Sequence, residues 1–291
     1  MKWWLALLVG LLSPAAVQAA AINLSPASHD VVLEDANSSE TLSFRLTNNT
    51  PASVALALSA VDFGPLGETG GIAFLGQDDQ SWQHRLTPWL SLDRDLVTID
   101  SGQSTEVKVR IDNRLDLSPG GHYAAVLAEL KDSVGLADQP RSAIGWQGIM
   151  ASQFYVLKKG GESYDLKFVD GEPAGLIMRW PAKIALRWRA DGNTHVQPYG
   201  TVVVKKNRGR QVASGILNQD SAIILPGAVR VLETSLESGR IIWPGRYQIQ
   251  VNYHHQASQE MTTVEFTWWY VPWWLPIVII IPGLWLWRRR G

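Results

Sequence analysis

The sequence predicts an all-β protein with two tandem immunoglobulin-like β-sandwiches, followed by a single C-terminal transmembrane helix. Three observations support this fold class. Apolar and polar residues alternate through most of the chain, which is typical of strands with one buried face. Two turn phrases occur twice in the same order, which indicates a duplicated module. A long uncharged stretch lies near the C-terminus, which indicates a membrane span.

The first expected element is a secretory signal peptide over residues 1–19. Lys2 precedes an apolar run from Trp3 to Leu12, and small residues with a Val-Gln-Ala ending follow it. The run is too short to cross a membrane easily, so we expect cleavage after Ala19 rather than an uncleaved anchor. Roughly 245 residues then precede the uncharged stretch, which is enough for one large or two ordinary domains.

The first sandwich is expected over residues 22–159. Its strands include the alternating segments 42–47 and 106–111, and residues 154–157 form its expected last strand. Two long loops, 64–86 and 131–145, make it larger than an ordinary immunoglobulin-like domain, and loops of this length are often functional. Two glycines at the end of Lys158-Lys-Gly-Gly161 provide an expected hinge to the next domain.

The second sandwich is expected over residues 161–265, with alternating segments at 184–189 and 247–254. The repeated turn phrases support it. Pro119-Gly-Gly-His-Tyr123 and Pro244-Gly-Arg-Tyr247 each open a late strand, as a Pro-Gly turn and tyrosine do at the corner of immunoglobulin-like domains.

The usual strand order of such sandwiches predicts where the loops lie. Loop 131–145 becomes the F–G loop, beside residues 48–52 at the tip farthest from the membrane. Loop 64–86 becomes the C–D loop and faces the second sandwich. Loops 191–198 and 254–259 of that sandwich then face back across the junction.

The transmembrane helix is expected over residues 266–287, with a cytoplasmic tail at 288–291. No charged side chain lies between Glu265 and Arg288, and this length spans a hydrocarbon core of about 30 Å. Basic residues beside a span stay cytoplasmic, so the rest of the chain is predicted on the extracytoplasmic face of the cell membrane, extracellular or periplasmic. A cleaved sorting signal is the alternative, but no Leu-Pro-x-Thr-Gly motif precedes it. The predicted interface residues are Trp268, Trp269, Tyr270, Trp273, Trp274, Trp285, Trp287, Arg288, Arg289 and Arg290.

Composition and motifs exclude several functions. The predicted ectodomain loses Lys2 and the tail arginines, so its acidic residues outnumber the basic ones, which argues against nucleic acid or an anionic surface as partner. The chain has no cysteine, which excludes extracytoplasmic thiol chemistry. It also lacks the motifs of serine hydrolases, nucleotide-binding loops and zinc proteases, so we predict no enzymatic activity and no cofactor.

Histidines are the strongest candidates for a metal or pH-sensing site. The loop positions place His84, His195, His254 and His255 near the same domain junction, and imidazoles ligate metals and titrate near neutral pH. Surface loops often carry histidine, however, and consecutive strand residues such as His254 and His255 point to opposite faces. We therefore assign no metal site.

Two further groups have structural alternatives. Asp93, Asp95 and Asp100 suggest calcium, but they lack the glycine turn and distant glutamate of an EF-hand loop, which favours a solvated strand edge. Trp82 and Trp89 suggest a stacking platform for sugar, but burial of one of them over the junction explains them as well.

Several motifs resemble a known family. Asn23-Leu-Ser-Pro26, Leu42-Ser-Phe-Arg-Leu-Thr-Asn-Asn49 and Pro119-Gly-Gly-His-Tyr-Ala-Ala125 resemble the first domain of WxL-interacting surface proteins and, more distantly, periplasmic pilus chaperones. Pro244-Gly-Arg-Tyr-Gln-Ile249, a last strand, a span and a basic tail follow the order of the WxL-interacting type. The resemblance implies a bacterial, non-enzymatic surface protein that binds another exported protein or a cell-wall polymer.

Three functions follow as hypotheses. The first is a membrane-anchored binding or scaffold protein that uses backbone edges or distal loops. The alternative is a chaperone-like assembly factor that lends the edge of residues 144–157 to secreted or pilus subunits, and an open edge there discriminates it from the first. The third is an enzyme or sugar-binding module that uses Trp82 and His84.

Overall fold

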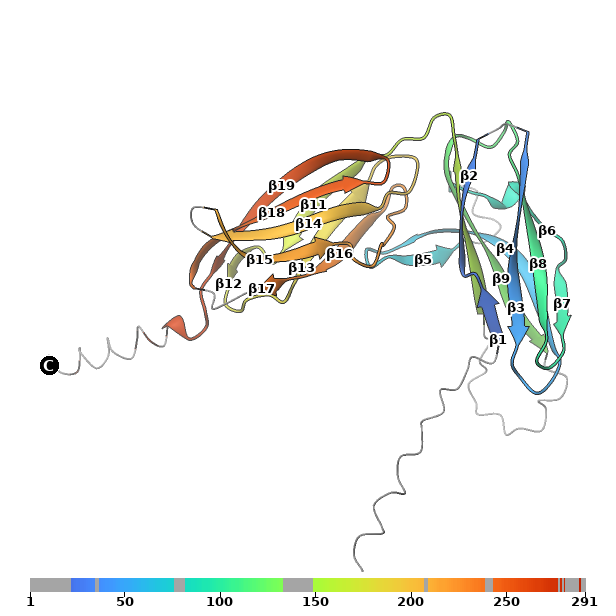
Figure 1. Ribbon diagram of the computed structural model, residues 1–291, viewed down its shortest axis with the longest axis horizontal. Coiled ribbons are helices and arrows are strands. Elements are labelled where there is room, and N and C mark those ends of the chain that lie inside the picture. Colours follow the sequence, from blue (N-terminus) through green and yellow to red (C-terminus); the bar gives the residue numbers. More distant parts are fainter. Residues whose placement is uncertain are drawn as a thin grey trace, which may run out of the picture.

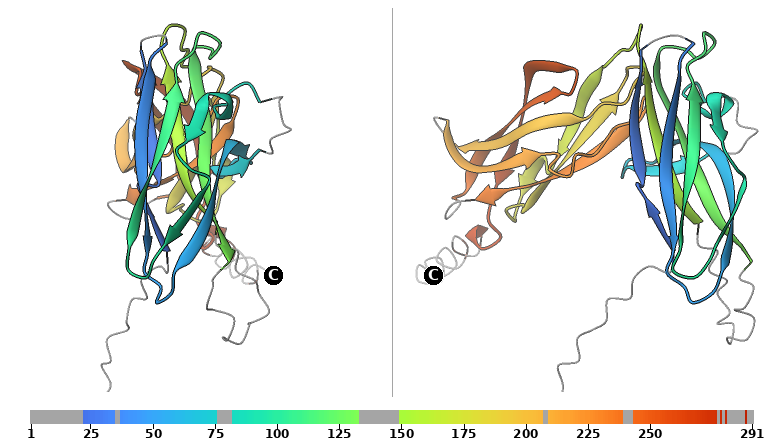
Figure 2. Two further views of the ribbon diagram at one scale, coloured as in Figure 1. Left: turned by 90° about the vertical axis from the view of Figure 1, so that its right-hand side faces the viewer. Right: turned by 45° about the vertical axis from the view of Figure 1, so that its right-hand side comes forward.

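The computed structural model describes the following residues: 22–34, 37–75, 82–132, 149–206, 209–238, 243–276, 278, 280 and 288. Its named elements are β-strands and one short 3-10 helix, η1 (Thr87–Trp89). Figure 1 shows two β-sandwiches set at an angle to each other, and Figure 2 shows the same arrangement from two other sides. The predicted all-β, immunoglobulin-like class is confirmed.

The first sandwich uses the strands between residues 22 and 158. One sheet contains, in spatial order, β1 (Ile22–Ser25), β3 (Ser39–Asn48), β8 (Ser104–Asp112) and β6 (Leu90–Leu92). The facing sheet contains β2 (Ser28–Leu33), β10 (Ile149–Lys158), β9 (Gly120–Asp132), β4 (Val54–Leu66) and β5 (Gly71–Phe74), with β7 (Leu96–Ile99) also paired to β4.

The second sandwich repeats this plan between residues 166 and 270. Its smaller sheet contains β11 (Leu166–Glu172), β13 (Lys183–Ala190) and β16 (Val229–Ser235). Its larger sheet contains β12 (Gly175–Ile177), β19 (Ser258–Tyr270), β18 (Gly245–His255), β14 (Pro198–Lys206), β15 (Arg210–Leu217) and β17 (Glu237–Ser238).

Each sandwich begins with a chain segment that changes sheets. β1 pairs antiparallel with β3, and the chain then crosses to the other sheet, where β2 pairs parallel with β10. The second sandwich does the same with β11 and β12, the latter parallel to β19. These two pairs are parallel in otherwise antiparallel sheets, because a strand that crosses between sheets arrives beside the last strand in the same direction.

Two hydrophobic cores hold the fold together. One lies between the sheets of the first sandwich and includes Phe44, Leu56 and Phe154, all fully buried. The other fills the second sandwich around Trp188 and extends across the junction to Tyr123 of β9. Each large apolar side chain that is fully buried contributes roughly 1.5–3 kcal/mol to the free energy of folding. The two sandwiches therefore share one continuous apolar core at their contact.

The chain between the sandwiches is a hydrogen-bonded turn rather than a free hinge. The Glu162 carboxylate accepts hydrogen bonds from the backbone N–H groups of Gly160 and Gly161 at 2.9 and 3.1 Å, and from the Lys159 amine at 3.1 Å. Hydrogen bonds to this carboxylate lower the pKa of Glu162 to about 2. The largest effect comes from the backbone N–H of Glu162 itself, followed by those of the other N–H groups and the Lys159 amine. Gly160 has a φ of +101°, which a residue with a side chain rarely adopts.

The predicted start of the membrane span at Phe266 is wrong. Strand β19 continues to Tyr270, and Trp268 is completely buried in the second core instead of lying at a membrane interface. The alternation of β19 turns Phe266, Trp268 and Tyr270 inward, because an apolar face needs a core to cover it. No helix among the described residues is long and apolar enough to cross a membrane. Trp285, Trp287, Arg289 and Arg290, like the predicted signal peptide, lie outside the described residues.

Candidate binding edge and the junction between the sandwiches

The first candidate site is the N-terminal half of β10, the strand that contains the predicted last strand 154–157. β10 pairs with β9 along its whole length, from Ile149 to Lys158, but with β2 only from Gln153 onward. No described strand pairs with residues 149–152 on the side away from β9. We call these four residues the open edge. The expected edge at 144–157 is thus covered in its second half and open in the described part of its first half, and residues 144–148 lie outside the described residues.

The change of sheets at the start of the chain creates this opening. The last contacts on this side come from the segment between β1 and β2: the Gln153 N–H donates to the Ala27 carbonyl at 2.8 Å, and the Ser152 hydroxyl donates to the Pro26 carbonyl at 3.1 Å. Backbone groups of alternate residues in a strand point to the same side. Because the Gln153 N–H points toward β2, the N–H and C=O groups of Ile149 and Ala151 also point outward, where no described strand meets them.

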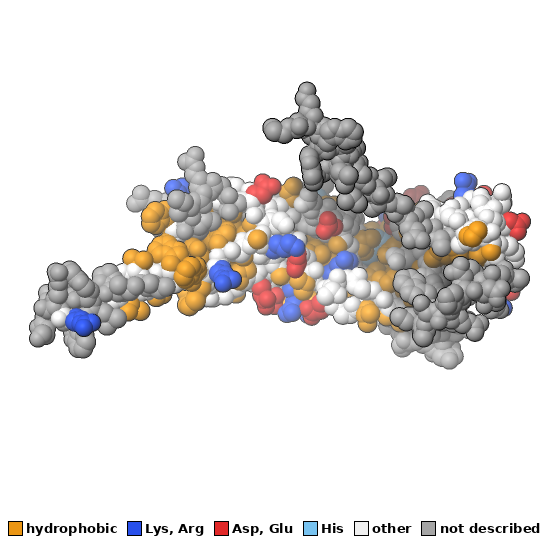
Figure 3. Space-filling model, turned by 90° about the horizontal axis from the view of Figure 1, so that it is seen from below, with side chains coloured by type: hydrophobic (Ala, Val, Ile, Leu, Met, Phe, Trp, Pro, Cys, Tyr) orange, Lys and Arg blue, Asp and Glu red, His pale blue; other side chains and the backbone are white. Residues whose placement is uncertain are grey.

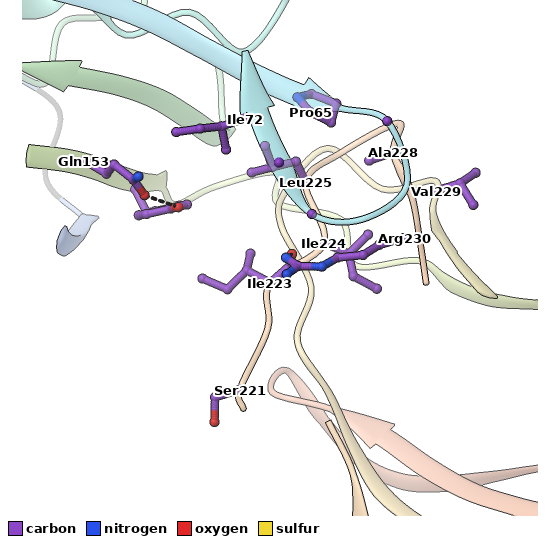
Figure 4. Close-up of a pocket in the computed structure, with 14 residues that line it drawn as sticks. Pro65, Ile72, Gln153, Ser221, Ile223, Ile224, Leu225, Ala228, Val229 and Arg230 are labelled. Carbon is purple, nitrogen blue, oxygen red and sulfur yellow. Dashed lines mark hydrogen bonds between the residues drawn. The ribbon is translucent and has the colours of Figure 1, made fainter. Parts of the chain in front are cut away.

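The open edge leads toward a cavity of about 430 Å³ between the sandwiches. Gln153 and Tyr155 lie on the same face of β10 as Ile149, and both line this cavity. Figure 4 shows the other walls, which come from the β4–β5 hairpin of the first sandwich and from residues 221–230 of the second. Ile149 itself is 52% exposed, so the strand presents an apolar side chain at its open end and polar ones at the cavity.

Arg230 is the charged group of the cavity. Its guanidinium donates a hydrogen bond to the Ile223 carbonyl and lies against the backbone of Gly70, where an added Cβ would be 2.2 Å from the guanidinium carbon. Burial lowers the pKa of Arg230, an effect that the nearby Tyr155 opposes. Gly70 is required here for close approach and for its φ of +86°.

The β4–β5 hairpin ties the sandwiches together from the other side. The Val231 N–H donates to the Glu68 carbonyl at 2.8 Å, and the Glu68 carboxylate forms an ion pair with Arg187 at 2.9 Å. The expectation that loop 64–86 faces the second sandwich is confirmed, but its first part is an ordered hairpin with strand β5 rather than an open loop. Residues 76–81 of it lie outside the described residues.

Tyr123 is the centre of the junction. Its hydroxyl accepts a hydrogen bond from the His195 backbone N–H at 2.8 Å and lies 3.2 Å from the His195 Nδ1. The Gly121 N–H donates to the Asn193 carbonyl at 2.9 Å, so loop 191–198 faces the first sandwich as predicted. Burial raises the pKa of the Tyr123 phenol far above its ordinary value. Tyr123 therefore stays a neutral structural group.

The four histidines do not form one cluster. His84 and His195 lie on two sides of Tyr123, with ring centroids 6.1 and 5.8 Å from it. His255 stacks on Tyr164, and His254 lies beside Tyr199. Within the described part of the chain, no three histidine, aspartate or glutamate side chains come close enough to hold a metal ion. What the structure does bring together is His84, Tyr123 and His195.

The tryptophan and aspartate candidates have structural partners. Trp82 is half-buried against the junction core and meets His84 edge-to-face at 5.1 Å. Trp89 donates from its Nε1 to Asp116 at 3.1 Å. Asp93 pairs with Arg94 at 2.7 Å, and this hydrogen bond lowers the Asp93 pKa. These contacts match the structural alternatives given for both groups.

Asp62, His122 and Lys158 are among the buried polar residues that sequence reasoning missed. Asp62 accepts hydrogen bonds from the backbone of Leu86 and Thr87, the Thr87 hydroxyl and Arg85, and so fixes the segment before η1. His122 places both ring nitrogens 2.7–2.8 Å from backbone carbonyls. Lys158 donates to two carbonyls from the end of β10. Asp62 lies within an apolar strand and Lys158 ends one, and a charged residue in such a position was the sequence feature that could have indicated burial.

Comparisons with known proteins give fold neighbours only. No protein-family model and no curated protein sequence matches the chain. Among solved structures, the class 5 fimbriae chaperone CfaA is 13% identical with a TM-score of 0.45, over 86% of this chain and 99% of that one. The YadV chaperone is 10% identical with a TM-score of 0.38 over 86% and 99%, and the E. coli chaperone DraB is 12% identical with a TM-score of 0.36 over 84% and 96%. The resemblances to pilus chaperones and to WxL-interacting proteins both stay predictions.

Proposed function

We propose that this chain is a chaperone-like, extracytoplasmic binding protein that takes up an extended segment of another exported polypeptide as an added strand at the open edge of β10. The observation that supports this proposal is the change of sheets between β1 and β2, after which no strand in the described part of the chain pairs with residues 149–152 on one side. Strand addition to an exposed sheet edge is a recurring mode of peptide recognition.

The open edge has enough hydrogen-bonding capacity for a reversible complex. Ile149 and Ala151 together offer two N–H donors and two C=O acceptors to a guest strand. At about 1 kcal/mol each, four hydrogen bonds contribute about 4 kcal/mol, or about a thousandfold in Kd. Apolar contact with the exposed Ile149 adds to this. A guest that continues along β10 next meets Gln153, Tyr155 and the cavity.

An assembly factor fits this geometry better than a permanent scaffold. An open strand edge is an aggregation liability, which folded proteins normally blunt with charge, proline or a covering segment. Ile149, Met150 and Ala151 supply none of the side chains that blunt an edge. An edge of this kind is explained if a client strand covers it for part of the time.

Strand β19 is the second candidate edge. It pairs with β18 along its length but with β12 only at residues 268–270. Its outward side chains between Thr263 and Thr267 are polar or charged and include Glu265. Charged and polar edges resist strand addition. We therefore assign client binding to β10.

We further propose that the C-terminal segment tethers the protein to the outer face of the membrane. The support is the sequence: residues 271–287 carry no charged side chain, and arginines follow at 288–290. β19 ends at Tyr270, so the proposed span begins after this strand instead of at Phe266.

Photocross-linking in cells tests the binding proposal. A photoreactive residue at Ile149 should capture an exported polypeptide, and the same residue at Leu115, which is 76% exposed in the same sandwich, should not. Ala151→Pro should reduce capture at least tenfold, because proline removes the outward N–H and its ring occupies the position of the guest strand. Ala151→Ser keeps the N–H and should capture normally. Equal capture by the proline and serine variants would refute strand addition at β10.

A further inference from the structure

Exposed apolar side chains gather at the end of the second sandwich that lies opposite the linker. They are between 40 and 63% exposed, and Figure 3 shows hydrophobic side chains concentrated on this side of the molecule, next to the C-terminal chain. We call this set the aromatic end: Leu176, Met178, Trp243, Trp269, Trp273 and Trp274. Single exposed apolar residues are ordinary, but a contiguous group marks an interaction site.

Strand pairing places two of these side chains, Leu176 and Trp269, next to each other. Leu176 of β12, Trp269 of β19 and Arg246 of β18 are direct partners in register and form one row across the outer face of the sheet. Such neighbours have Cβ atoms about 4.5–5.5 Å apart. The next row toward the linker, Thr267 and Gln248, is polar. On β18 and β19, the outer face is therefore apolar at this last row and polar in the row behind it.

The chain leaves the sandwich through the aromatic end. After β19, the Val271 N–H donates to the Ile177 carbonyl at 2.9 Å, and the Trp273 N–H donates to the Met178 carbonyl at 3.2 Å. The Trp243 backbone is held by Lys206, whose amine donates to the carbonyls of residues 243 and 244 at 3.0 Å. The uncharged sequence 271–287 thus begins within the aromatic end.

The charge around the aromatic end is of one sign. The segments that form it, 173–182, 204–206 with 209–211, 243–249 and 266–276, contain basic residues and no acidic ones. Arg179, Arg210 and Arg246 are exposed there. Glu172, Glu233 and Glu237 lie outside these segments, in β11, β16 and β17. A basic rim around tryptophans complements a layer of phospholipid headgroups.

We propose that the aromatic end contacts the headgroup region of an anionic phospholipid membrane, so that the second sandwich rests on the membrane to which the chain is tethered. This inference depends on the proposed tether. The proposal departs from the expectation that the acidic balance of the ectodomain argues against an anionic surface, because net charge does not describe where on a surface the basic residues lie.

A lipid-depth measurement on the full chain tests the contact. The chain has no cysteine, so Leu176→Cys can carry a single fluorescent label. Ile216→Cys is a matched control, because it is 61% exposed, against 63% for Leu176, and lies on the outer face of the same sheet near the linker. Both proteins are reconstituted into vesicles of phosphatidylcholine and phosphatidylglycerol that contain a lipid with a nitroxide at the headgroup.

The expected result is loss of most of the fluorescence at position 176 and little loss at position 216, with Met178→Cys behaving like position 176. If the chain floats with the vesicles but neither label is quenched, or both are quenched equally, the contact is refuted and the tether stands. If the chain does not float with the vesicles, tether and contact are both refuted. Client binding at β10 is tested separately through Ile149, so its outcome is unaffected.

Discussion

Replacement of Tyr123 by phenylalanine should loosen the junction between the sandwiches. The Tyr123 hydroxyl is buried and accepts the His195 backbone N–H at 2.8 Å. Phenylalanine keeps the ring contacts but leaves this N–H without its partner, which costs about 1–3 kcal/mol. For a chain of this size, each kcal/mol lowers the melting temperature by about 2–4 °C. We therefore expect a decrease of about 6 °C for a loss of about 2 kcal/mol.

Two measurements on the full chain in detergent micelles check this prediction. Thermal unfolding followed by tryptophan fluorescence gives the melting temperature, and trypsin cleavage after Lys159 reports opening of the linker. Tyr155→Phe is the control, since its hydroxyl donates to the half-buried Gln153 side chain at 2.7 Å, which water can replace. If Tyr123→Phe melts within about 1 °C of the wild type and is cut no faster, the hydrogen bond does not hold the junction together.

Three further predictions follow. Burial lowers the pKa of His195 below its ordinary 6.5, so the unfolded chain binds a proton that His195 in the folded junction does not. The free energy of unfolding should therefore fall as the pH drops below 6.5, and it should fall less in His195→Asn. Melting temperatures measured over a range of pH values check this. Asp62→Ala leaves the backbone N–H groups of Leu86 and Thr87 without an acceptor and should cost roughly 3 kcal/mol in urea unfolding, whereas Asp62→Asn, which keeps one acceptor, should cost less. Gly121→Ala places a Cβ 2.1 Å from the Tyr123 hydroxyl and should cost about 1–3 kcal/mol, whereas Gly64→Ala, with neighbours at 3.6 Å, should melt near the wild type.

Alternation of apolar and polar residues predicted the fold class because it reports burial directly. Segments 42–47, 106–111, 184–189 and 247–254 all lie in strands. The positions of loops 64–86 and 191–198 at the junction also followed from the strand order. The change of sheets could not be predicted, since it depends on which distant strand each half of the first segment meets. A local sequence pattern could not predict the open edge for the same reason, since the edge is open only because no described strand pairs with it.

The error at Phe266 has a different cause. Hydropathy does not distinguish an aromatic strand from the aromatic belt of a membrane helix, because both are uncharged and rich in tryptophan. Alternation was the signal that could have separated them: Val264, Phe266, Trp268 and Tyr270 face inward, and Thr267 lies between them facing outward. The uncharged stretch therefore included residues 266–270, which belong to a strand of the second sandwich.

The position of this strand constrains how the proposed client site is presented. β19 ends at Tyr270 and the uncharged sequence follows at once, so under the proposed tether the second sandwich has only a few residues, at about 3.5 Å each, with which to move away from a membrane. β10 enters the first sandwich at the end opposite the linker and reaches the linker at Lys158. Ile149 therefore lies at the end of the first sandwich that is away from the linker, as the aromatic end does in the second sandwich. A client strand added there would meet the open edge away from the lipid surface, where a polypeptide that has already left the membrane is accessible.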